Sequence, residues 1–199
     1  MSLPVTEWIR RHAHPLTTLD PEAPLTDLLP LCDMVRDAKI VALGASTRQA
    51  HELSTLAHRM LRLLVEQLGF RSLALEGDEL ASIQLDEYGR TGTGDPRALL
   101  AAARSFWRTE EILAVVRWMR SYNEQHPADP VRVVHAGEHS RQVVPQPDTL
   151  GDIEQWVAET TTEWHVHTAH KIVYWGGIAH TVSGTPPADS VSTPSSAPR

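Results

Sequence analysis

A turn rich in chemistry-bearing side chains follows the apolar run that ends at Gly44, in "VALGASTRQAHE". The turn and the start of the next segment hold Ser46, Thr47, Arg48, His51 and Glu52. At a strand-to-helix turn, the helix amides and the positive end of the helix dipole favour an anion, and an arginine adds a full charge. The pattern therefore predicts a substrate-binding turn. The alternative is that Ser46 or Thr47 caps the helix while Arg48 is solvated.

Two further residues could act on a substrate held at this turn. Glu76 closes the apolar stretch "LALE", where a carboxylate is costly unless it is paired or functional. It is therefore either a general acid or base, or the partner of Arg48 or Arg59 in a salt bridge. His180 follows two glycines in "WGGIAHT", a pattern typical of backbone that approaches a ligand closely. The candidate catalytic set is Glu76, His180 and His51, and a hydrogen-bonded histidine at a strand exit is the alternative for His180.

The histidines late in the chain raise the question of a metal site. They are His135, His139, His165, His167 and His170. No cysteine–histidine spacing typical of zinc is present, so we expect no metal and no cofactor. "GRTGTGDP" superficially resembles a phosphate-binding loop, but it lacks the terminal Gly-Lys-Ser/Thr and does not follow a strand directly.

Four short apolar runs must position these residues. The runs are 39–43 ("KIVAL"), 71–76 ("RSLALE"), 131–136 ("VRVVHA") and 171–176 ("KIVYWG"). Segments with helical spacing separate them, the clearest being 53–68, which Gly69 should end. Others are expected at 5–12, 25–35, 80–88, after Asp95, after Thr109 and near Gly151. This alternation predicts an α/β fold with a mainly parallel sheet flanked by helices.

The predicted fold places the candidate residues at one edge of the sheet. Ligands of parallel α/β sheets bind beyond the carboxyl ends of the strands, and polar groups follow all four runs. We expect a single domain over residues 1–182. Residues 183–199 are rich in Ser, Pro, Thr and Ala, which predicts a disordered tail.

Composition narrows the partners. The chain has 199 residues and a net charge of −7 without a basic stripe, which argues against nucleic acid. No window is apolar enough to span a membrane, and the N-terminus lacks the apolar core of a secretory signal. Cys32 is the single cysteine, which fits a reducing cytoplasm. We therefore expect a cytoplasmic protein that acts on a small molecule.

The stretch "VALGASTRQAHELSTLAHRMLRLLVEQLGFRSLALEGD" resembles the opening of the erythromycin esterase superfamily. "LDEYGRTGTGDP", "RTEEILAVVRWMRSYN", "VRVVHA" and "KIVYWGGIAHT" continue the resemblance to about Thr181. The resemblance implies metal-free hydrolysis, of a macrolide lactone in some members. A histidine of the first turn then acts as base, assisted by the glutamate after the second strand and by late histidines. Glu52, Arg59, Glu76 and His180 match residues of the family pattern.

The departures from the family pattern include its catalytic histidine. Arg48 stands where the family has its catalytic histidine, and Gly177 stands where it has the first histidine of the late motif. Ala45 and Ile178 replace a glutamate and an asparagine, and no aspartate is evident in "HAGEHS". Arginine stays protonated near neutral pH and cannot act as a general base. The chain is also about half the family's usual length.

Two functions follow from these patterns. In the first, the chain is a subunit with an incomplete site that pairs with a second esterase-like chain in antibiotic biosynthesis. The substrate is then a small natural-product intermediate, which loses an ester or an anionic leaving group such as sulfate, as in aziridine formation. The predicted substrate-binding residues are Arg48, Ser46, Thr47, Glu52 and Arg59. In the second, the chain is a standalone hydrolase that uses Glu76 with His51 or His180 as base. A decayed fragment without function is a third, weaker alternative.

Overall fold

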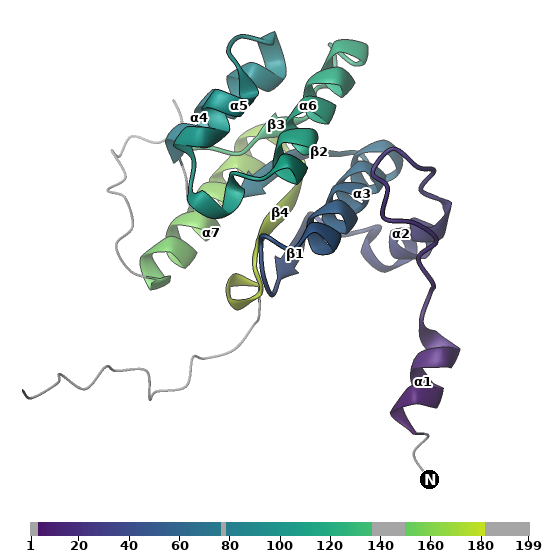
Figure 1. The fold of residues 1–199 in the computed structure, drawn as a ribbon. Helices are drawn as coiled ribbons and strands as arrows, with labels where there is room; N and C mark the ends of the chain where they lie inside the picture. The colour runs from purple at the N-terminus through teal and green to yellow at the C-terminus, as the bar shows by residue number, and fades with distance from the viewer. Residues whose placement is uncertain (1–3, 77–78, 137–149, 182–199) are drawn as a thin grey trace, which may run out of the picture.

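Helices alternate with parallel strands in the computed structural model, which describes residues 4–76, 79–136 and 150–181 (Figure 1). The helices are α1 (Val5–His12), α2 (Leu29–Val35), α3 (His51–Leu68), α4 (Glu79–Thr91), α5 (Pro96–Ala102), α6 (Glu110–Gln125) and α7 (Leu150–Thr168). The strands are β1 (Ile40–Ala45), β2 (Phe70–Leu75), β3 (Arg132–Val133) and β4 (Lys171–Gly177). Short 3-10 helices occupy Thr26–Leu28, Ser105–Trp107 and Ile178–His180. The predicted tail, 183–199, lies outside the described residues.

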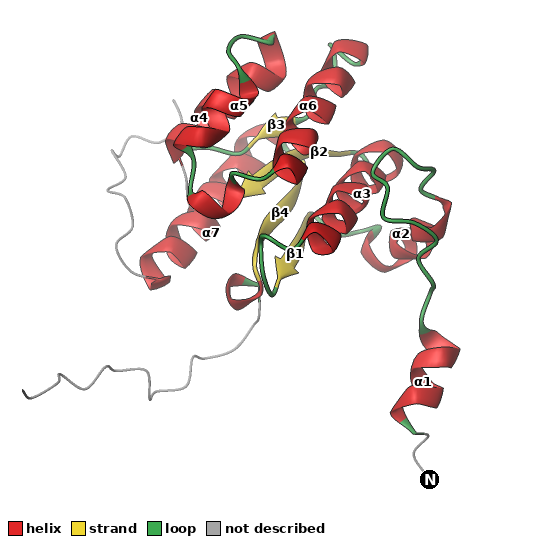
Figure 2. Ribbon diagram, in the orientation of Figure 1, coloured by secondary structure: helices red, strands yellow, loops and turns green. Residues whose placement is uncertain are grey.

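The described strands form one parallel sheet in the order β1-β4-β2-β3 (Figure 2). This confirms the predicted α/β class and places β1 at one edge and β3 at the other. β3 is shorter than the predicted run 131–136. On the outer side of this edge, the Asp86 carboxylate of α4 accepts a hydrogen bond from the Val133 amide at 2.9 Å. A side chain thus takes the place of a further strand there.

The helix boundaries test the sequence signals one by one. Gly69 ends α3 in the left-handed conformation, with φ at 69°, as predicted. The helices predicted after Asp95 and Thr109 are α5 and α6, and both side chains accept a hydrogen bond from the first turn of their helix. The capping role considered for Ser46 or Thr47 is wrong. Helix α3 begins only at His51, and its N-cap is Ala50, which offers no side-chain acceptor.

Helices cover both faces of the sheet. Helices α3 to α6 pack on one face around a core that includes Leu61, Leu64, Phe70 and Trp107. Helix α7 covers the other face through Trp164, which packs with Ala74, Ile172 and Tyr174. No described helix is long and apolar enough to cross a membrane. This arrangement leaves the carboxyl ends of the strands at one edge, where the candidate residues lie.

Candidate active site

The carboxyl ends of three strands bring the central candidate residues together. β1 and β4 run in register to their last residues, with Gly44 opposite Gly176 and Ala45 opposite Gly177. Arg48 lies in the loop after β1, and Glu76 follows β2 directly. Because β4 lies between β1 and β2, Arg48 and Glu76 meet above the end of β4. The predicted convergence at this edge is therefore observed for these strands.

Arg48 and Glu76 form an ion pair whose acceptor is a single carboxylate oxygen. Arg48 Nε donates to Glu76 Oε2 at 2.9 Å, and Arg48 Nη2 donates to the same oxygen. The Gly177 amide donates to this oxygen as well, at 2.8 Å. The guanidinium carbon lies 4.6 Å from the centre of the Phe106 ring. Three donors thus converge on Oε2, and an aromatic face covers the cation.

The backbone of Glu76 is fixed as firmly as its side chain. Its amide donates to the Trp175 carbonyl at 3.3 Å, and its carbonyl accepts a bond from Trp107 Nε1 at 3.1 Å. Only 4% of Glu76 is exposed. The salt bridge considered for Glu76 therefore exists, with Arg48 as its partner. A buried carboxylate at this position is compatible with the apolar strand because it is paired.

Gly177 gives the Arg48 guanidinium its space. A Cβ atom at position 177 would lie 2.8 Å from Arg48 Cζ and 3.2 Å from Nη1. A side chain at position 177 and an arginine side chain in this conformation therefore exclude each other. These are the two positions at which the family pattern has histidines. The two departures form one structural unit, since each accommodates the other.

Tyr174 lies under the same end of β4. Its ring extends along the strand toward Gly176, where an added Cβ would lie 2.6 Å from the phenol Cζ. The hydroxyl is buried and has no hydrogen-bond partner among the described residues. Burial, and secondly the negative charge of Glu76, raise the pKa of Tyr174. The phenol therefore stays protonated beside the ion pair across the physiological pH range.

The other predicted residues of the first turn lie outside this cluster. Ser46, Thr47 and Glu52 are exposed. His51 is also exposed, and its Nδ1 lies 2.7 Å from Glu111 Oε1 of α6. The hydrogen bond to Glu111 raises the pKa of His51. His51 thus pairs with Glu111, whereas Glu76 pairs with Arg48, so the two predicted catalytic residues do not contact each other.

Arg59 lies in a different part of the molecule. Its side chain is fully buried and pairs with Asp27 through two hydrogen bonds, of 2.7 and 2.9 Å. It also donates to the carbonyls of Thr18 and Pro24. This placement favours a structural role over the predicted contact with substrate. One signal in the sequence could have distinguished the structural Arg59 from the site residue Arg48. Arg59 falls at helical spacing among the apolar residues that form the buried face of α3.

His180 ends the 3-10 helix that follows β4, and its side chain lies outside the described residues. His139 also lies outside them. Of the remaining late histidines, His135 Nε2 lies 3.5 Å from Asp86 Oδ2, and His170 Nδ1 lies 2.9 Å from Ser72 Oγ. Among the residues that the structure describes, no group of three or more histidine, cysteine, aspartate or glutamate side chains could hold a metal ion.

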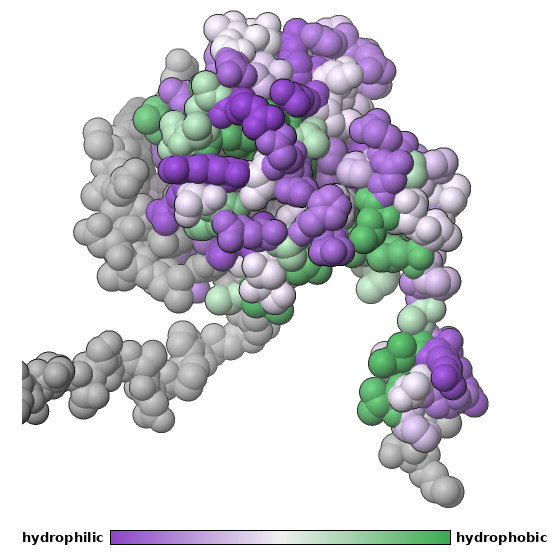
Figure 3. Space-filling model, viewed as in Figure 1, coloured by the Kyte–Doolittle hydropathy of each residue, from purple (hydrophilic) through white to green (hydrophobic). Residues whose placement is uncertain are grey.

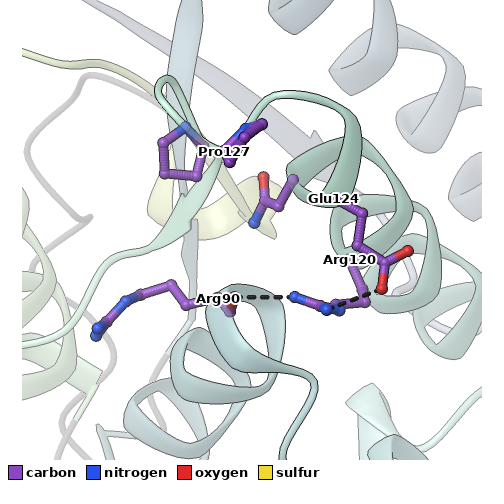
Figure 4. Close-up of a pocket in the computed structure, with 6 residues that line it drawn as sticks. Arg90, Arg120, Glu124 and Pro127 are labelled. Carbon is purple, nitrogen blue, oxygen red and sulfur yellow. Dashed lines mark hydrogen bonds and ion pairs between the residues drawn. The ribbon is translucent and has the colours of Figure 1, made fainter.

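A cavity of about 430 Å³ next to the amino end of β3 offers less chemistry (Figure 4). Its polar groups are already engaged. Arg120 donates to the Arg90 carbonyl and pairs with Glu124, both at 2.8 Å. Asn123 bonds the backbones of Gly89 and Val131. The cluster around Arg48 and Glu76 is therefore the better candidate site.

Comparison with known proteins finds similarity to one family over part of the chain. Residues 65–137 match the family model described as erythromycin esterase. The chain is 29% identical over 118 residues to the erythromycin esterase type II of Escherichia coli, and 30% identical over 122 residues to YbfO of Bacillus subtilis. Over part of its length, the chain is therefore similar to the erythromycin esterases. Each alignment covers 59% of this chain but only 28% and 26% of the two relatives, about a quarter of their length.

Similarity of fold extends over more of the chain than similarity of sequence. A solved structure described as a succinoglycan biosynthesis protein superposes with a TM-score of 0.73, at 20% identity, over 87% of this chain and 65% of the other. At this identity the match concerns the fold alone. The family model covers Glu76 but not Arg48 or Gly177, so their correspondence to family histidines rests on the resemblance of the sequence motifs.

The residues that support the Arg48–Glu76 ion pair are not evident from the sequence. Phe106 and Trp107 lie in a 3-10 helix, 30 residues from Glu76 in the sequence. Gly177 was noted as a departure, but its amide bond to Glu76 and its fit to Arg48 were not foreseen. For Phe106 and Trp107, the sequence offered one sign, the pair of aromatic residues in "SFW" shortly before a capped helix. For Gly177 no local signal existed, because its role depends on the Glu76 and Arg48 side chains, which come from the ends of other strands.

Proposed function

We propose that this chain is an erythromycin-esterase-like subunit whose own catalytic site is incomplete, and that a second esterase-like chain completes it. One observation carries the proposal. The guanidinium of Arg48 pairs with Glu76 and fills the space above Gly177. These are the positions at which the family pattern has the histidines that activate water. The proposed substrate is a small natural-product intermediate that contains an ester.

The groups present in the cluster do not supply a base. Arginine remains protonated at all physiological pH values. Glu76 Oε2 already accepts three hydrogen bonds, so proton transfer to it would disrupt contacts that hold the site together. The protonated Tyr174 is a donor and not an acceptor of protons. A histidine from a partner chain is the simplest source of the missing base.

The charge of the cluster favours ester hydrolysis over elimination of an anionic group. Binding of sulfate at Arg48 requires a cation that is free to pair with it. Glu76 and the Phe106 ring already engage this cation. An anionic leaving group therefore meets a cation whose charge is already largely balanced, whereas a neutral ester does not need a free cation. Hydrolysis is also the activity that the name of the Escherichia coli relative indicates.

The test uses, as candidate partner, an esterase-like protein from the same source organism that retains both family histidines. Hydrolysis of 4-nitrophenyl butyrate is measured with each protein alone and with both together, and their complex is analysed by size-exclusion chromatography. We expect co-elution, and turnover at least ten times faster for the mixture than for the sum of the two proteins. If this chain alone reaches the rate of the mixture, the proposal is wrong.

Glu76→Gln separates the proposal from a standalone hydrolase that uses Glu76 as base. Glutamine keeps an acceptor oxygen for Arg48 and Gly177 but cannot take up a proton. In the complex we expect a reduced but measurable rate, because Glu76 orders the site without transferring a proton. Complete loss of turnover, with Glu66→Gln unaffected as the exposed control on α3, supports the standalone hydrolase instead.

A further inference from the structure

Helix α1 has an apolar side that none of the described residues covers. None of its residues is buried, and Val5, Trp8 and Ile9 are 74%, 55% and 49% exposed. Figure 1 shows the helix beyond α2 and away from the sheet, and Figure 3 shows apolar side chains gathered along one side of it. An exposed tryptophan between two aliphatic side chains is typical of a helix that docks on another surface.

The connection to the body keeps α1 on its own side of the molecule. Thr17 donates through its amide to Asp27 at 2.9 Å, and the Thr18 carbonyl accepts a bond from Arg59 at 2.6 Å. Only residues 13–16 link α1 to this anchor, and four extended residues span at most roughly 14 Å. Helix α7 lies across the sheet from α2 (Figure 1). Among the described residues nothing packs on the apolar side of α1, so this side is open to another molecule.

A groove of suitable character lies between β1 and α7. Because β1 is the edge strand and α7 packs mainly over β4 and β2, the outer side chains of β1 stay open, and Ile40 is 44% exposed. The groove encloses about 300 Å³, enough to admit an indole ring. Its apolar lining consists of Ile40, Ala42, Val157, Ala158 and the ring of Tyr174.

The charges beside the two surfaces are complementary. Arg10 and Arg11 follow the apolar residues of α1, and Glu154 lines the groove, with Glu159 exposed about one turn further along α7. Helix α1 holds two arginines and one glutamate, Glu7, which pairs with Arg11 at 2.9 Å. The helix is therefore net positive by one charge, whereas the chain as a whole carries −7, so the two attract each other weakly. Both halves of a matching contact are thus present in one sequence, and they lie apart in the described structure (Figure 1).

We infer that the groove between β1 and α7 binds helix α1 of a second copy of this chain, with Trp8 inserted between the strand and the helix. One helix of eight residues covers less than the roughly 1,000 Å² that a specific interface needs. Reciprocal exchange doubles the contact and closes it with two-fold symmetry. This dimer is independent of the proposed enzymatic function.

The inference is tested by the molar mass of the full chain in solution, measured by light scattering during size-exclusion chromatography. We expect a dimer for the unmodified chain and a monomer for Trp8→Glu. Met34→Glu is the matched control, because Met34 on α2 is 78% exposed and should leave the dimer intact. Since none of the α1 residues is buried, the circular dichroism of Trp8→Glu should stay that of a folded protein. A monomeric unmodified chain, or a dimeric Trp8→Glu, overturns the inference.

A second experiment locates the contact. Trp8→Cys combined with Ala158→Cys should give a disulfide-linked dimer on oxidation, since Ala158 lines the groove. The control combines Trp8→Cys with Ala101→Cys, an exposed position on α5, and should link at least ten times less. Equal linking in both pairs overturns the inference. So does an absence of linking, which is the result expected if another molecule or another segment of the chain fills the groove.

Discussion

Two arginine–carboxylate pairs join distant parts of this chain, and they differ in how completely they are enclosed. The side chains of Arg59 and Asp27 are 0% and 3% exposed, and two backbone carbonyls bind the same guanidinium. The Arg48 side chain is 23% exposed and that of Glu76 is 6% exposed. An aromatic ring and a glycine surround this second pair.

The difference in exposure indicates that the Arg59–Asp27 pair has a structural role and that the Arg48–Glu76 pair belongs to a site. Arg59 ties the segment after α1 and the Asp27 turn to α3, so its hydrogen bonds hold chain segments in place. Arg48 lies at the carboxyl ends of the strands, where α/β folds bind ligands, and part of it is open to solvent. Both arginines are candidates for substrate binding in the sequence, yet only the second remains accessible.

The largest expected effect comes from breaking the enclosed pair. Arg59→Met leaves the Asp27 carboxylate buried without its cation and removes donors from two carbonyls. We expect the melting temperature to fall by roughly 10 °C in differential scanning calorimetry. Arg48→Met is the matched control and should lower it by less than half as much. Equal losses would show that the two pairs contribute alike.

The decline of stability in acid should report on the enclosed Arg59–Asp27 pair. Hydrogen bonds from Arg59 and from the Thr17 amide hold the pKa of Asp27 well below its ordinary value of 3.8. The unfolded chain binds the proton first, so this stabilisation is fully present above about pH 4 and is lost as the pH falls below it. We expect Asp27→Asn to flatten the decline in melting temperature between pH 5 and pH 2. An unchanged acid limb would contradict the role of this pair.

Gly177→Ala sharpens the account of the open pair. The added Cβ meets the Arg48 guanidinium and should displace it from Glu76. Because the displaced group is the end of a flexible side chain, we expect the melting temperature to fall by only about 3–5 °C. Arg48→Ala in the same chain removes the clash, so the double variant should lose less than the sum of the two single variants. Strict additivity would show that the two positions are not coupled.

The smallest effect is expected at His51. The hydrogen bond to Glu111 raises the pKa of His51, so its contribution to stability is present below about pH 6.5 and is lost as the pH rises through the raised value. The His51 side chain is 66% exposed, and solvent screens the pair. We expect His51→Ala to change the melting temperature by less than about 1 °C at pH 6 and by nothing measurable at pH 9. Loss of esterase activity in this variant would favour the standalone hydrolase.

Local signals in the sequence predicted the elements well. Gly69, Asp95 and Thr109 mark helix ends because their roles depend on neighbouring backbone groups, and the structure confirms all three. The polar turn after β1 was a weaker guide. Ser46 and Thr47 are capping residues by type, but α3 begins at His51, where Ala50 provides no side-chain cap. Composition alone could not say where the helix starts.

The sequence by itself determined the parallel α/β architecture and the edge of the sheet that carries the candidate site. Its motifs also predict that Arg48 and Gly177 stand in place of family histidines. Hydrophobic periodicity and turn chemistry are local, so they can be recognised without coordinates. Only the tertiary structure decided which arginine pairs with Glu76, and that the missing side chain at position 177 is what makes room for Arg48. These facts depend on atoms from three strand ends that lie far apart in the chain, and only packing brings them within contact distance.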